Sequence, residues 1–174
     1  MKKITYILFM SLLLFNNFSI ASEKKIVFID INQIFIDSNA GKDINSFIKQ
    51  KKKDLDDQVN FSVNKINKKK EKLTAQKNVL DSNEYSKKIK ELEEEIKIIN
   101  TSISKKNDEL LKLQKNIEAK FSKNLNSIIE EYSIENSIDI IFKKQNILMA
   151  KNEMDITKDI LNLFNKKIAK IDID

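Results

Sequence analysis

The chain has 174 residues, with 32 basic residues that are all lysine, 26 acidic residues and a net charge of +6. It has no histidine, cysteine, tryptophan or proline, and its single glycine is Gly41. A phosphate-binding loop needs several glycines, and acid–base or zinc chemistry loses its commonest side chain without histidine, so the composition argues against an enzyme and predicts no cofactor.

Residues 1–21 have the pattern of a secretory signal peptide. Met1–Lys3 is basic, Ile4–Phe15 is mostly apolar, and small residues stand at Ser19 and Ala21. We expect cleavage after Ala21. The alternative is an uncleaved membrane anchor, although the apolar run is short for a bilayer span.

Residues 22–42 are predicted to form a strand and a short helix. Lys25–Ile31 is β-branched and aromatic apart from Asp30, and it is too short for a helix, so it is interpreted as a strand. The helix begins with the sequence INQIF, at Ile31.

Residues 43–133 are predicted to form a long helical arm, because they contain neither proline nor glycine. The second half shows a heptad pattern of apolar residues, with Lys106 at the one skipped position: Ile89, Leu92, Ile96, Ile99, Ile103, Leu110, Leu113 and Ile117. After Ile117 the spacing becomes four, four and three, at Phe121, Leu125 and Ile128. This four-residue stutter is expected to change the packing direction of the helix.

The first half of the arm has a weaker seam. Val59, Val63, Ile66, Leu73 and Leu80 keep the rhythm, with lysines at positions 70 and 77. Lysine at such positions costs stability, so we expect a loose contact between the two halves.

A turn near residues 80–84 would fold the arm into an antiparallel hairpin. Asp81, followed three residues later by Glu84, resembles a helix-capping box. The alternative is one continuous helical rod, because polar residues alone need not end a helix.

Residues 134–174 are predicted to contain two strands and a helix. Ser137–Lys143 and Asn146–Ala150 are apolar runs around a polar break, and Asp155 is expected to cap the helix that follows. One face of this helix carries Ile156, Ile160, Leu163, Phe164 and Ile168.

The expected fold is therefore mainly α with a small β base. Both ends of the chain would meet in one sheet, from which the helical hairpin projects, and the open edges of that sheet invite other copies of the chain. The residues expected in this oligomerisation body are Ile26, Phe28, Ile29, Ile140, Ile141, Phe142, Ile147 and Leu148.

Two end motifs carry a resemblance to a known family. KIVFIDINQIF (Lys25–Phe35) and IDIIFKKQNILMAKNEMDITKDIL (Ile138–Leu161), with the long helical region between them, resemble the Skp/OmpH family of periplasmic chaperones. The resemblance implies a homotrimer with a β-rich body and three helical arms around a cavity. It also implies that the chain is exported to the periplasm and holds unfolded outer-membrane β-barrel proteins there without nucleotide. The lipopolysaccharide site proposed for some members contains arginines, which this chain lacks, so that site is left unassigned.

Candidate client-binding residues are the apolar side chains outside the seam and the lysines of the first half of the arm. The apolar candidates are Phe47, Phe61 and Val79, although packing within the chain is the alternative for both phenylalanines. The candidate lysines are Lys49, Lys51, Lys52, Lys53, Lys68, Lys69 and Lys70. They would steer acidic clients by long-range attraction, and an anionic membrane surface is a further expected contact.

Other functions fit the sequence less well. An exported structural or adhesive coiled coil would have the same seam but would bind no unfolded client. Nucleic-acid binding is disfavoured by the absent arginine and the export signal, despite a pI near 9.2. Asp30, Asp37 and Asp139 have no spacing that suggests a metal site, and capping or surface roles fit them better.

Overall fold

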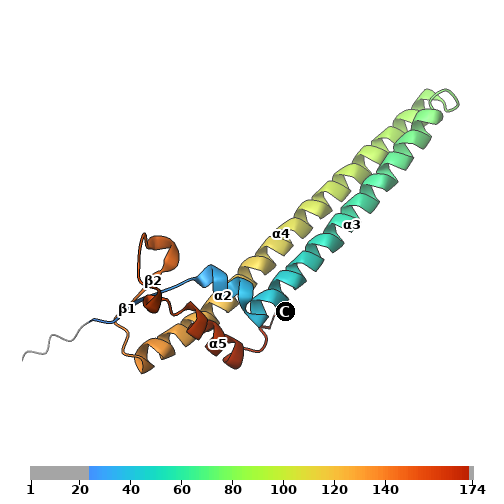
Figure 1. Ribbon diagram of the computed structural model, residues 1–174. Helices are drawn as coiled ribbons and strands as arrows, with labels where there is room; N and C mark the ends of the chain where they lie inside the picture. The colour runs from blue at the N-terminus through green and yellow to red at the C-terminus, as the bar shows by residue number, and fades with distance from the viewer. Residues whose placement is uncertain (1–23, 173–174) are drawn as a thin grey trace, which may run out of the picture.

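Two long antiparallel helices form an arm, and the elements before and after it in the chain meet in a small body at its base (Figure 1). The computed structural model describes residues 24–172, so the predicted signal peptide at residues 1–21 lies outside the described part. The elements in chain order are β1 (Ile26–Ile29), α2 (Ile31–Asp37), α3 (Asn39–Ala75), α4 (Ser82–Glu135), β2 (Ile140–Lys143), the 3-10 turns η1 (Lys144–Asn146) and η2 (Asn152–Met154), and α5 (Thr157–Lys167). The predicted fold class is confirmed. Within residues 24–172, no helix combines the length and the apolar character needed to cross a bilayer.

The arm is a hairpin of two unequal helices. At a rise of about 1.5 Å per residue, the 37 residues of α3 span about 55 Å and the 54 residues of α4 about 80 Å. The alternative of one continuous rod is therefore wrong. The turn occupies residues 76–81, earlier than predicted, because α3 ends at Ala75 and the amides of Val79 and Leu80 both donate to the carbonyl of Gln76.

Asp81 caps α4 as the sequence predicts. Its carboxylate accepts hydrogen bonds from the backbone amides of Asn83 and Glu84, at 2.8 and 3.0 Å. These bonds satisfy two of the amides that a helix start leaves without partners.

The seam of α4 faces α3 as expected, but the seam of α3 differs from the prediction. Leu92 and Ile117 are buried, and the other predicted residues of the α4 seam are half-buried. On α3, Ile66 and Leu73 are buried, whereas Val63 is 47% exposed and Ser62 is half-buried. The seam residue one turn before Ile66 is therefore Ser62, and Val63 lies outside the seam. A seam through Val63 would continue seven and fourteen residues later, at Lys70 and Lys77. It would therefore place two lysines in the interface, at a cost in stability.

The sheet has two parallel strands, and the third predicted strand is wrong. β1 pairs with β2 from Ile26 opposite Ile140 to Ile29 opposite Lys143. Asn146–Ala150 is not a strand, because the chain turns through η1 after β2 and the amide of Ile147 donates to the carbonyl of Lys144. Parallel strands cannot be joined by a tight hairpin, and here the whole arm forms the connection.

The other edge of β1 contacts the segment before α5. Phe28 forms an isolated parallel bridge with Asp155, and the amide of Ile156 donates to the carbonyl of Phe28. β1 is shorter than predicted, because Asp30 already caps α2 by accepting a hydrogen bond from the amide of Gln33. Asp155 accepts from the amide of Thr157, so it supports the start of α5 from one residue further out than predicted.

The body core lies where α2, α4 and α5 meet. Phe121 on α4 packs against Phe35 on α2 and Phe164 on α5, with ring centroids 4.9 and 4.8 Å apart. Phe121 belongs to the predicted stutter, so α4 changes partners there, from α3 alone to the helices of the body. Ile160 and Phe164 on α5 are fully buried, as the predicted apolar face requires.

Candidate functional site

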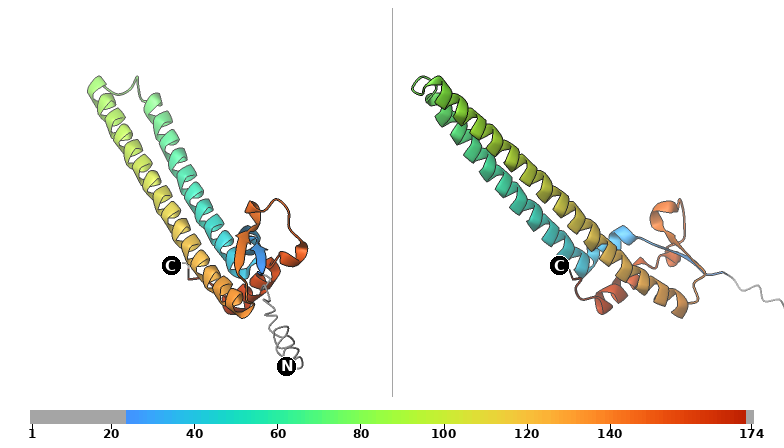
Figure 2. Two further views of the ribbon diagram at one scale, coloured as in Figure 1. Left: turned by 90° about the vertical axis from the view of Figure 1, so that its left-hand side faces the viewer. Right: turned by 180° about the vertical axis from the view of Figure 1, so that it is seen from behind.

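The arm carries apolar side chains that neither the seam nor the body covers. It stands clear of the body over most of its length (Figure 2). Away from the body, the exposed large apolar residues of the arm helices and their connecting turn are Phe61, Val63, Val79, Ile98 and Leu111, and Ile134 is exposed at the body end of α4. Phe61 is 74% exposed and Val79 is 82% exposed, which places both predicted residues in contact with solvent. Single exposed apolar residues are common on protein surfaces, so these side chains are candidates for contact with another molecule.

Four of these residues are absent from the predicted contacts: Val63, Ile98, Leu111 and Ile134, the last of which lies just beyond the predicted arm. Ile98 and Leu111 lie outside the alternation of three and four that defines the α4 seam, and that departure was the available signal for their exposure. Val63 was assigned to the seam. Its exposure follows from the different seam of α3.

Phe47 differs from the other predicted apolar contacts. It is half-buried and packs against the core of the body, and the ammonium of Lys51 lies 5.3 Å above the centre of its ring. This is cation–π geometry, which stabilises both side chains where they are. The structure thus favours the packing alternative for Phe47.

All seven predicted lysines are exposed, but they do not form one patch. Consecutive residues of a helix point about 100° apart, so Lys51, Lys52 and Lys53 surround α3. Lys69 is directed toward α4, where it forms an ion pair with Glu95. The lysines therefore give the first half of the arm a diffuse positive field.

Glu95 links the two helices in the outer half of the arm. The ammonium of Lys69 bonds one of its carboxylate oxygens, and that of Lys65 lies 3.3 Å from the other. The hydrogen bond from Lys69, with a smaller contribution from Lys65, lowers the pKa of Glu95 from its ordinary value. Closer to the body, Lys106 donates a hydrogen bond from the skipped seam position to the amide oxygen of Gln58.

The lowered pKa of Glu95 makes a pH-dependent contribution to stability. This contribution is present above the ordinary carboxyl pKa of 4.5 and is lost as the pH falls through the lowered pKa of the folded chain. We expect Glu95→Gln to reduce the decrease in unfolding free energy on acidification, as measured by urea denaturation at a series of pH values. The neighbouring exposed Glu94→Gln is the control, because it removes the same charge. Equal pH dependence in both variants would contradict a linking role for Glu95.

The body presents apolar residues of the predicted oligomerisation set at its surface. Ile26, Ile140 and Phe142 are 37%, 38% and 46% exposed, and Leu148 is fully exposed. Two others, Phe28 and Ile29, are buried in the core of this chain. The remaining two, Ile141 and Ile147, are half-buried. The outer edge of β2 has no partner strand among residues 24–172.

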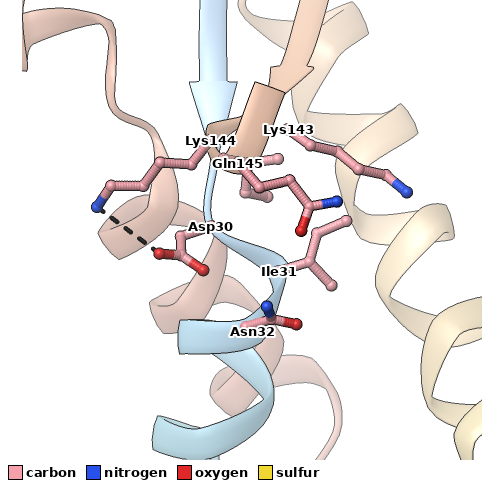
Figure 3. Close-up of a pocket in the computed structure, with 7 residues that line it drawn as sticks. Asp30, Ile31, Asn32, Lys143, Lys144 and Gln145 are labelled. Carbon is pink, nitrogen blue, oxygen red and sulfur yellow. Dashed lines mark ion pairs between the residues drawn. The ribbon is translucent and has the colours of Figure 1, made fainter. Parts of the chain in front are cut away.

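An open pocket of about 350 Å³ lies at the carboxyl ends of β1 and β2 (Figure 3). Its lining residues are Ile29, Asp30, Ile31, Asn32, Lys143, Lys144 and Gln145. The ammonium of Lys144 lies 3.7 Å from a carboxylate oxygen of Asp30 and 3.7 Å from one of Asp155. These ion pairs join η1 to the cap of α2 and to the segment before α5, and their geometry fits a structural role.

Two of the three aspartates considered as metal ligands have other partners. Asp30 caps α2, and Asp139 accepts a hydrogen bond from the backbone amide of Lys25 at 2.7 Å. Within residues 24–172, no three carboxylates gather closely enough to hold a metal ion.

The comparisons with known proteins agree with this geometry. A family model described as "Outer membrane protein (OmpH-like)" matches residues 25–164. A crystal structure from Caulobacter crescentus CB15, proposed to be an outer membrane chaperone (OmpH-like), has a TM-score of 0.81 and 12% sequence identity, over 88% of this chain and 90% of that one. That likeness shows a shared fold, and no curated protein matches the chain. Since the family model spans most of its length, the chain belongs to the OmpH-like family of outer membrane proteins.

Proposed function

We propose that this chain is an ATP-independent holdase chaperone of the periplasm, which binds unfolded outer-membrane β-barrel proteins between helical arms and prevents their aggregation. Membership of the OmpH-like family supports a chaperone role, as does the fold shared with the Caulobacter protein. The lack of a glycine-rich phosphate loop agrees with action without nucleotide.

The observation that carries the proposal is the exposure of apolar side chains on an otherwise charged arm. Phe61, Val79 and Ile98 are each at least 60% exposed. A purely structural hairpin would be more soluble with polar residues at these positions. Covering one such side chain with client surface gains about 1.5–3 kcal/mol at most, so each contact is weak and exchangeable. Several weak contacts suit a client that has no fixed shape.

Charge supports the first step of capture. Asp43–Ser82 contains ten lysines and six acidic residues, and its predicted contact lysines are exposed. Such a field raises the rate at which an acidic client arrives, and it would also attract an anionic membrane surface. Because salt screens this attraction, capture is expected to slow as salt rises.

A cavity requires more than one arm, so the proposal includes a homotrimer. Ile26, Ile140, Phe142 and Leu148 on the body are the proposed contacts between subunits, together with the free edge of β2. Apolar residues beside an unpaired strand edge favour association with another chain.

Aggregation of a client tests the holdase directly. An outer-membrane barrel unfolded in urea is diluted into buffer with the chain, without nucleotide, and light scattering is followed. We expect the chain to suppress scattering, and a Phe61→Ser/Ile98→Ser variant to suppress it less. The matched control is Asn60→Ser/Lys97→Ser, which changes the preceding exposed residues. Scattering that the chain does not change would favour a structural or adhesive coiled coil.

A further inference from the structure

The last described residues form a strap across the base of the arm. After α5 ends at Lys167, Ile168–Asp172 has no regular secondary structure and returns to the base of the arm (Figures 1 and 2). The family match ends at residue 164, so the strap lies beyond the matched segment.

The strap places an apolar residue and an acidic residue against α4. Ile171 is 4% exposed and belongs to the buried cluster that contains Ile117 and Phe121. The ammonium of Lys120 donates a hydrogen bond to the carbonyl of Asp172 at 3.0 Å and lies 3.9 Å from its carboxylate. The base of the arm therefore has an apolar site beside a cation. Ile171 fills the apolar site, and Asp172 binds the ammonium of Lys120.

The ion pair of the strap is more exposed than the apolar contacts of the helix before it. Lys120 and Asp172 have side chains that are 43% and 78% exposed, and ion pairs so exposed stabilise little. Within the strap, Ile171 is buried and Ile168 is half-buried against the same cluster, whereas α5 buries both Ile160 and Phe164 completely. Release of the strap thus leaves the apolar contacts of α5 in place.

We propose that the strap is an autoinhibitory segment, which occupies a client-binding site at the base of the arm until an unfolded client displaces it. The client segment that fits has an apolar side chain followed by a carboxylate, as Ile171 and Asp172 do. Since the site is free only while the strap is released, the strap lowers the apparent affinity of the chain for client. This inference rests on the proposed holdase function.

A crosslinked strap tests the proposal in the full chain. Because the sequence has no cysteine, Lys120→Cys/Asp172→Cys supplies the only two thiols. One sample is joined by a flexible bis-maleimide, and the control sample of the same variant is capped with N-ethylmaleimide. We expect the joined sample to bind a fluorescent, urea-unfolded outer-membrane barrel several-fold more weakly than the capped sample. Equal binding would overturn the autoinhibitory role, whereas binding by neither sample nor by the unmodified chain would instead contradict the holdase function.

A single substitution that weakens the strap is expected to raise the affinity for client, whereas the crosslink lowers it. Ile171→Ser weakens the strap, and we expect it to bind the same client several-fold more tightly than the unmodified chain. Lys170→Ser, at the preceding exposed position of the strap, is the control and should leave binding unchanged. Weaker client binding by a folded Ile171→Ser chain would show that the strap supports the site and does not block it. If Ile171→Ser lowers the thermal midpoint too far for binding to be measured, the crosslinked pair decides.

Discussion

Gly41→Ala is expected to destabilise the chain by about 3 kcal/mol, the upper end of the cost of overpacking. A Cβ atom at Gly41 would lie 1.7 Å from the carbonyl oxygen of Phe35 and 2.9 Å from the hydroxyl of Ser38. The first contact is with backbone, which cannot rotate away as a side chain can. α2 and α3 would have to separate, and that movement would disturb Ile34 and Ala40, which are both fully buried.

The control for this substitution is Asn45→Ala, one turn further along α3 at an exposed position. Alanine is the better helix former, so this variant should be at least as stable as the parent. Urea denaturation followed by circular dichroism measures both variants. A Gly41→Ala chain as stable as the parent would contradict the close crossing of α2 and α3.

Phe121→Ala is expected to cost about 3–5 kcal/mol, as large-to-small substitutions of buried aromatic residues do. Phe121 is 3% exposed and contacts the rings of Phe35 and Phe164, so its removal leaves a cavity between three helices. The loss would be measured by urea denaturation. Because α4 joins arm and body at this point, we also expect faster hydrogen exchange of α5.

Phe61→Ala is the matched comparison, since it removes the same side chain from an exposed position on the arm. It should change the unfolding free energy by no more than about 0.5 kcal/mol, as surface substitutions usually do. We expect it nevertheless to weaken client holding. If Phe61→Ala were as destabilising as Phe121→Ala, Phe61 would be packed in solution and unavailable to clients.

The helical part of the fold could be predicted because periodicity reports it directly. The α4 seam, the stutter at Phe121 and the cap at Asp81 each follow from spacing or from residue type. The body is harder to predict from the sequence, because a short apolar run does not show which segment it pairs with. Asn146–Ala150 has the composition of a strand, yet Leu148 is fully exposed in this single chain.

The candidate site could be predicted only in part, for a related reason. Exposure of Phe61 follows from its place outside the seam, whereas Phe47 is just as far from the seam but is covered by the body. The covering segment comes from distant parts of the chain, so local spacing carries no sign of it. The strap was missed likewise, since nothing near Ile171 indicates that it returns to α4 beside Lys120.

The most direct test of the holdase is a mass measurement by light scattering. The mature chain is measured alone, and again after mixing with a urea-unfolded outer-membrane barrel, with no nucleotide present. We expect a trimer in the first case and a discrete soluble complex in the second. A monomer or dimer that leaves the barrel to precipitate would contradict the holdase and favour a structural coiled coil.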